Sequence, residues 1–130
     1  MLLTIDIHDR RPIYRQIADG IKTLIAGGHL REGDPVPTVR QMAADLGVNF
    51  NTIATAYREL QDEGLIIVKH GRGATVASRA GDRPNAPQHS QDELRRPLRV
   101  VLTELVLAGI PRNQILAMVN DELRGLIKKG

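Results

Sequence analysis

Two amphipathic helical segments separated only by Gly47 and Val48 are the feature that most constrains the fold of this chain. Thr38 precedes the first segment and Asn49 precedes the second, and both residue types cap helix N-termini. A connection this short, with glycine at its start, forces two helices to cross at a steep angle. The sequence therefore predicts a helix-turn-helix, with core-facing side chains at Val39, Met42, Ala43, Leu46, Ile53, Ala56, Tyr57 and Leu60.

Another helix and a loop precede this pair. Pro12 suits the first turn of a helix, and Gly27 and Gly28 are expected to end it. The segment HLREGDPVP, residues 29–37, is expected to be a loop because of its glycine and prolines. The apolar face of this first helix comprises Ile13, Ile17, Ile21, Leu24 and Ile25.

After Gly64 the apolar residues no longer recur at helical spacing. Two short β-branched runs, LIIVK and ATVA, flank HGRG, in which Gly71 and Gly73 would form a tight turn, and this pattern predicts a hairpin over residues 66–77. Three helices followed by a hairpin make a winged helix-turn-helix, in which the third helix, here 49–63, enters the major groove of DNA. The sequence thus predicts a DNA-binding domain over residues 1–78, with the hairpin as a wing on the adjacent minor groove and backbone.

A second, purely helical unit is expected after a linker at 79–90, which is polar and contains two prolines. Ser90 and Glu93 match a capping box, but Pro97 is expected to bend the next helix or to restart it as late as Arg96. The predicted fold class is therefore α+β and mostly helical.

Residues 91–130 are expected to be a two-helix dimerisation region. Their apolar faces exceed what a helical hairpin can hide by itself, so a second copy would complete a four-helix core. The predicted interface residues are Leu94, Leu98, Val101, Leu102, Leu105, Ile115, Leu116, Val119 and Leu123.

Net charge alone does not indicate nucleic-acid binding. The chain has a formal net charge of +3, yet residues 1–78 carry nine Lys and Arg against nine Asp and Glu, so the basic excess lies in the tail. Any DNA binding must therefore depend on where individual charges sit. No run of eighteen apolar residues occurs and the N-terminus does not have the order of a secretion signal, so a soluble, cytoplasmic protein without a membrane role is expected.

The sequence does not indicate catalysis or a metal centre. It contains no cysteine, and its four histidines are too scattered for metal-ligand spacing, so no metal or cofactor is expected. No Ser/His/Asp set, paired carboxylates or phosphate-binding fingerprint is visible, and the protein is not expected to be an enzyme.

Polar and basic side chains gather at two places, the start of the third helix and the wing turn, which can face one duplex. Asparagine can pair bidentately with adenine, and Phe50 or a threonine methyl can touch a thymine methyl. A basic wing tip suits phosphates or a narrow minor groove. The candidate DNA-binding residues are Thr38, Arg40, Asn49, Phe50, Asn51, Thr52, Thr55, Arg58, His70, Gly71 and Arg72.

Each candidate also has an explanation that needs no DNA. Thr38 and Asn49 would cap their helices in any case, Phe50 could pack against the wing, and the basic turn could simply be solvated. Arg40 could pair with Asp45. A cation is unfavourable in the first turn of a helix, however, so a purely structural reason for Arg40 is harder to find.

Four motifs follow one another over residues 12–77: P-T-V-R-Q-M-A, G-V-N-x-N-T, A-Y-R-E-L and E-G-L-I. Together they resemble the DNA-binding domain of the GntR family of bacterial transcription regulators. The N-x-N-T and A-Y pairs and the short tail resemble the YtrA-like subfamily, whose members end in two dimerising helices. The resemblance implies that Arg40 contacts DNA. Many members carry arginine where this chain has Phe50 or Ala54, so an A/T-rich site is expected rather than arginine-to-guanine readout.

Three classes of function are weighed: a dimeric repressor of an inverted-repeat operator, a winged-helix module that binds only proteins, and an enzyme. The second predicts an uncharged, apolar third helix, contrary to the outward Asn51, Thr55 and Arg58. A ligand pocket in the tail is disfavoured because two helices are too small to enclose one, and no small-molecule effector is assigned. A membrane role is disfavoured by acids on the polar faces, namely Glu104, Asp121 and Glu122.

Overall fold

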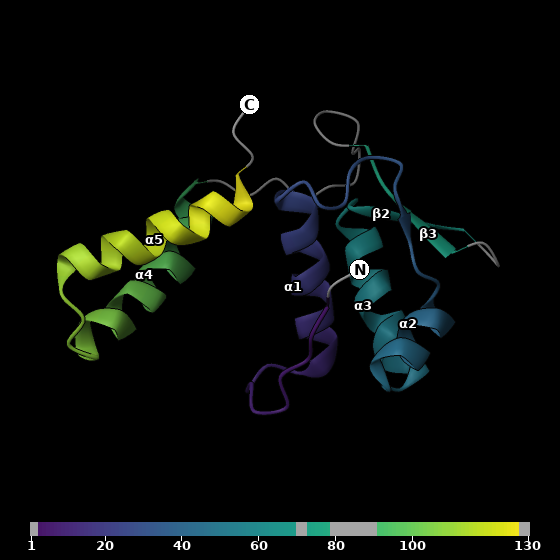
Figure 1. The fold of residues 1–130 in the computed structure, drawn as a ribbon, viewed down its shortest axis with the longest axis horizontal. Helices are drawn as coiled ribbons and strands as arrows, with labels where there is room; N and C mark the ends of the chain where they lie inside the picture. Colours follow the sequence, from purple (N-terminus) through teal and green to yellow (C-terminus); the bar gives the residue numbers. More distant parts are fainter. Residues whose placement is uncertain (1–2, 70–72, 79–90, 128–130) are drawn as a thin grey trace. The chain divides into compact units, whose positions relative to one another are not determined.

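The computed structural model describes residues 3–69, 73–78 and 91–127. The chain divides into two compact units, Met1–Pro87 and Gln88–Gly130, which are described separately. Within the described residues, the first unit has three helices and three short strands, and the second has two helices (Figure 1). This mostly helical α+β architecture, with a winged helix-turn-helix followed by C-terminal helices, confirms the predicted fold class.

The helices of the first unit form where apolar periodicity predicts them. Thr38 begins the second helix with a capping box: its side chain accepts the Gln41 N–H at 3.0 Å, and the Gln41 side chain accepts the Thr38 N–H at 3.0 Å. Gly47 ends this helix with φ of +65°, in a left-handed conformation that glycine adopts without strain. The helices are α1 (Ile13–Ala26), α2 (Val39–Leu46) and α3 (Phe50–Asp62).

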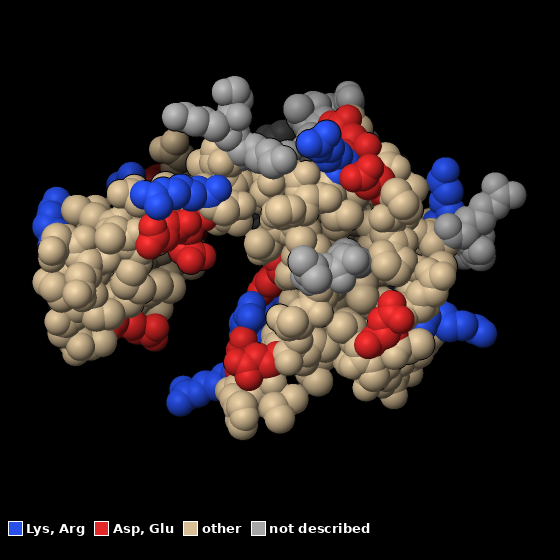
Figure 2. Space-filling model, in the orientation of Figure 1, with Lys and Arg blue, Asp and Glu red and all other residues tan. Residues whose placement is uncertain are grey.

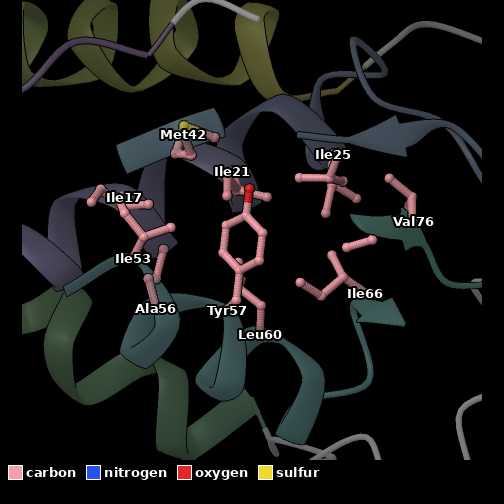
Figure 3. Close-up of a cluster of buried hydrophobic side chains, with 13 residues drawn as sticks. Ile17, Ile21, Ile25, Met42, Ile53, Ala56, Tyr57, Leu60, Ile66 and Val76 are labelled. Carbon is pink, nitrogen blue, oxygen red and sulfur yellow. The ribbon is translucent and has the colours of Figure 1, made fainter. Parts of the chain in front are cut away.

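The core lies between α1, α3 and the sheet, and Tyr57 is at its centre (Figure 3). Its ring lies between Ile21 and Met42 on one side and Ile66 on the other. The Tyr57 hydroxyl donates a hydrogen bond of 2.6 Å to the carbonyl oxygen of Pro37, which ties α3 to the chain just before α2. The predicted inward face of α3 is confirmed, because the four side chains are at most 2% exposed: Ile53, Ala56, Tyr57 and Leu60.

The segment predicted to be a loop, 29–37, contains a short strand. β1 (Pro35–Val36) pairs antiparallel with β3 (Gly73–Val76), which also pairs with β2 (Ile66–Lys69), giving the order β1-β3-β2. Proline is tolerated in β1 because it starts an edge strand, where a missing N–H costs little. The loop prediction is wrong at these two residues, since a strand this short is created by its pairing partner and not by its own sequence pattern.

β2 and β3 form the predicted hairpin, paired as far as Lys69 and Gly73. Gly73, assigned to the turn from sequence, is instead the first residue of β3. Its φ is +77°, and a Cβ at this position would lie 3.2 Å from Thr38 Cγ2, so glycine allows the hairpin to pass close to the start of α2. The predicted wing-tip contacts lie outside the described residues: His70, Gly71 and Arg72.

The second unit consists of α4 (Gln91–Leu107) and α5 (Arg112–Leu126). Pro97 lies inside α4, and the predicted restart as late as Arg96 is wrong. Proline removes only one hydrogen bond from a helix, and the other turns of α4 continue on both sides of it. The predicted cap at Ser90 and the linker before it lie outside the described residues. In the part of the chain described, no helix is long and apolar enough to span a bilayer.

Candidate nucleic-acid interface

The start of α3 presents polar side chains away from the core. Asn51, Thr55 and Arg58 are exposed, and Phe50 is 50% exposed although it is the only phenylalanine in the chain. Thr52 is half-buried. The helical period that buries one face of α3 therefore leaves most of the candidate residues of this helix accessible to a partner.

Hydrogen bonds within the helix start limit what each candidate can offer. The Asn49 side chain accepts the Asn51 N–H at 2.7 Å, so Asn49 acts as a helix cap. The Thr55 hydroxyl donates to the Asn51 carbonyl at 2.9 Å, which occupies its proton. Within the described residues, the side-chain amide of Asn51 has no partner. Asn51 therefore keeps both a donor and an acceptor for a base edge.

A groove of about 470 Å³ opens between α2, α3 and the hairpin. It brings together three predicted residues, Thr38, Arg40 and Phe50. Sequence reasoning missed the contribution of Val68, and it did not place Lys69 among the candidate DNA-binding residues although it favoured contact by the basic wing. Nothing in the sequence around Val68 indicates that it lines a groove, because it is one of several apolar residues in a short strand. The groove is lined by Thr38, Val39, Arg40, Phe50, Val68, Lys69 and Gly73.

Arg40 is exposed at the first turn of α2. The alternative of an ion pair with Asp45 is not found, and within the described residues the guanidinium has no hydrogen-bond or ion-pair partner. A free cation beside the positive end of a helix dipole is unfavourable unless an anion approaches it. The position of Arg40 on the groove therefore suits a negatively charged ligand.

A second groove, of about 410 Å³, runs between the start of α1 and the start of α3. Three more predicted residues line it, so the structure divides the candidates between two grooves on either side of the start of α3. Two other described candidates, Asn49 and Arg58, line neither of them. The lining residues of this second groove are Pro12, Ile13, Tyr14, Asn51, Thr52 and Thr55.

Ion pairs and one amide hold α3 against its neighbours. Arg15 of α1 makes two hydrogen bonds to Glu59, of 2.7 and 2.8 Å, and these bonds raise the pKa of the arginine. Lys22 pairs with Glu63 at 2.9 Å. The Gln61 side chain accepts the Val68 N–H at 2.8 Å, which joins α3 to the edge strand β2. These contacts join α3 to α1 on one side and to β2 of the hairpin on the other. The residues that make them are polar and are not identified by the apolar periodicity of the sequence.

The face drawn in Figure 2 carries charge of both signs. On the face drawn in Figure 2, Lys and Arg side chains are interspersed with Asp and Glu. Among the described residues, no three His, Cys, Asp or Glu side chains are grouped as metal ligands would be. Recognition must therefore rely on local groups, such as those of the two grooves.

A helix-turn-helix with an exposed polar start on its third helix, beside an exposed arginine and a hairpin, defines a DNA-binding protein of the winged-helix class. The family model described as bacterial regulatory proteins, gntR family, matches residues 13–76. The HTH-type transcriptional repressor YtrA of Bacillus subtilis strain 168 is 30% identical over 109 residues, which cover 84% of this chain and 82% of that protein. The chain belongs to the GntR family of DNA-binding transcription regulators.

Solved structures of similar proteins agree with this assignment. A transcriptional antiterminator from Listeria monocytogenes EGD-e matches with a TM-score of 0.78 and 29% identity, over 100% of this chain and 98% of that chain. AraR(DBD) in complex with operator ORX1 matches with a TM-score of 0.52 and 27% identity, over 58% of this chain and 93% of that chain. The second structure shows a protein of similar fold bound to operator DNA. The resemblance to the GntR family and its YtrA-like members is confirmed.

The capping box of α2 provides a test of the local structure beside the groove. Thr38→Ala should lower the free energy of unfolding by about 0.5–2 kcal/mol, because it removes the acceptor of the Gln41 N–H. Thr38→Ser keeps that acceptor and should stay close to the parent. Chemical denaturation of the three proteins measures the difference; equal stability of the alanine and serine variants would show that the cap contributes nothing.

Proposed function

We propose that this regulator is a homodimeric repressor that binds an inverted-repeat operator. One observation carries the proposal: α4 and α5 contain no buried residue. Their large apolar side chains instead face outward, and those that count as exposed are Leu94, Leu98, Val100, Val101, Val106, Leu107, Leu116, Met118, Val119, Leu123 and Ile127.

A second copy of the same helix pair is the partner that this surface fits best. Monomeric proteins rarely expose contiguous apolar surface on this scale. Of the predicted interface residues, Leu102, Leu105 and Ile115 are half-buried within the chain and the other six are exposed. Identical faces related by a two-fold axis would bury them in a four-helix core, which is the usual way that helical pairs become stable.

Such a dimer would present two winged domains to one side of a duplex. In each half, α3 would enter the major groove and the hairpin would lie on the adjacent minor groove or backbone, with half-sites roughly one helical turn apart. Residues 1–78 would then bind DNA, 79–90 would link, and 91–130 would dimerise. Repression is proposed because the similar YtrA of Bacillus subtilis is named a repressor.

The oligomer and the operator can be tested together. Sedimentation of the full chain at micromolar concentration should give a dimer, and footprinting on an operator selected from random DNA should protect two half-sites with dyad symmetry. A monomer under these conditions, or protection without dyad symmetry, would contradict the proposal.

Arg40→Ala should weaken operator binding by about 1–3 kcal/mol and leave the fold intact, because Arg40 is exposed and has no partner among the residues that the structure describes. The matched control is Arg31→Ala, which removes the same charge from an exposed residue in the loop after α1. Titration of labelled operator measures both affinities. An Arg40→Ala variant that binds as tightly as the Arg31→Ala variant would remove Arg40 from the interface.

A further inference from the structure

One sugar–phosphate strand must pass between α3 and the hairpin when both contact DNA. The major and minor grooves of a duplex are separated by a single backbone strand. If α3 enters the major groove and the hairpin meets the neighbouring minor groove, that strand crosses the space between them. In this protein the space is the groove of about 470 Å³ between α2, α3 and the hairpin.

Three of the lining side chains are suited to an anion. Arg40 and Lys69 contribute two cations from two different elements, and Thr38 contributes a hydroxyl. No acidic side chain is among the lining residues. Hydrogen bonds from arginine or lysine to a phosphate are stronger than hydrogen bonds between neutral groups, because both partners are charged.

The lining also includes apolar side chains, two of which are exposed. Phe50 is 50% exposed and Val68 is 37% exposed, and Val39 lies beside them in the lining. Phe50 and Val68 are large apolar side chains outside the core, whereas Val39 also packs against the core. A deoxyribose ring lacks the 2′-hydroxyl of ribose and therefore has an apolar face. This face lies next to each phosphate and can pack against apolar side chains.

The groove walls are held in place by contacts outside the lining side chains. Gln61 of α3 accepts the Val68 N–H at 2.8 Å, which fixes the β2 wall. Gly73 allows the hairpin to approach the start of α2, because a Cβ there would lie 3.2 Å from Thr38 Cγ2. These two contacts hold β2 against α3 and allow β3 to approach the start of α2, on either side of the groove.

We propose that this groove seats one phosphate and its neighbouring deoxyribose from the strand between the two DNA grooves. Arg40 and Lys69 hold the phosphate, and Phe50 and Val68 pack against the sugar. This assignment rests on the proposed placement of α3 and the hairpin on DNA. In this assignment Phe50 contacts a deoxyribose and not a thymine methyl. Val68 and Lys69 are added to the residues that contact DNA.

The phosphate is tested with single methylphosphonate linkages, which remove one backbone charge, placed in turn along the selected operator. For the parent chain, one linkage in each half-site should lower affinity roughly tenfold. The same linkage should lower the affinity of the double variant Arg40→Ala, Lys69→Ala only slightly, because this variant lacks the two side chains proposed to hold the phosphate. If every linkage costs the double variant as much as the parent, the phosphate is not held here and the inference is overturned.

The sugar contact is tested by Val68→Ala and Phe50→Ala. Val68→Ala should weaken binding roughly three- to tenfold. Ile67→Ala is the matched control, because Ile67 is 48% exposed on the same strand and does not line the groove. Equal losses for the two variants would count against the groove, and thermal melting verifies that each is folded.

Operators in which single thymines are replaced by deoxyuridine distinguish a sugar contact from a base contact. Phe50→Ala should bind more weakly than the parent by the same factor on every such operator. If its defect disappears when one thymine methyl is removed, Phe50 reads that methyl and the inference fails, although the protein still binds DNA. If the parent chain binds no duplex DNA, the proposed function fails with it.

Discussion

Residues 1–79 alone should bind the selected operator about 10²- to 10⁴-fold more weakly than the full chain, because one winged domain loses the avidity of two linked half-site contacts. The fragment contains the whole buried core of the first unit and should fold as a monomer. Sedimentation and operator titration of the two proteins measure the effect. A fragment that binds as tightly as the full chain would show that the tail contributes nothing to recognition.

A point variant separates dimerisation from the removal of the tail. Leu123 is 43% exposed on α5, and Leu123→Asp should place a charge in the proposed four-helix core and yield monomers. Gln114→Glu adds the same charge at an exposed position of α5 that faces away from Leu116, Val119 and Leu123, and it should remain dimeric. If both variants sediment as dimers, α5 is not the interface.

Tyr57→Ala should lower the free energy of unfolding by about 3–5 kcal/mol, since it empties the centre of the core. Tyr57→Phe keeps the ring and removes only the hydrogen bond to the Pro37 carbonyl, so a smaller loss of about 1–3 kcal/mol is expected. Denaturant titration gives both values. A phenylalanine variant as unstable as the alanine variant would mean that the hydrogen bond, and not the ring, accounts for the stability.

The same hydroxyl should make stability fall in alkaline solution. Burial raises the pKa of Tyr57 well above its ordinary value of about 10, so the folded protein keeps the proton that the unfolded chain releases. The contribution of Tyr57 is therefore present below pH 10 and is lost above it, by about 1.4 kcal/mol per pH unit. Tyr57→Phe should lack this alkaline loss, whereas Tyr14→Phe retains Tyr57 and should show it. Identical pH profiles for the two variants would contradict this explanation.

The order of helices and the identity of the core followed from sequence periodicity. Apolar residues three and four positions apart on α3 predicted Ile53, Tyr57 and their neighbours as buried, because a helix that packs on one side must repeat its apolar face. Thr38 and Asn49 were recognised as caps from residue type, and both act as caps in the structure. The partner Gln41 could also have been found, because it stands three residues after Thr38 as a capping box requires.

What the sequence determined alone was local: which segments are helical, which residues cap α2 and α3, which face of α3 is buried, and the family motifs that they carry. Tertiary structure alone decided how distant residues meet. β1 exists because β3 pairs with it, and Val68 and Lys69 reach the groove beside Arg40 because the hairpin folds back on the start of α2. Periodicity records the neighbours of a residue within its own element, whereas contacts across elements depend on packing of the whole domain, which no short window of sequence contains.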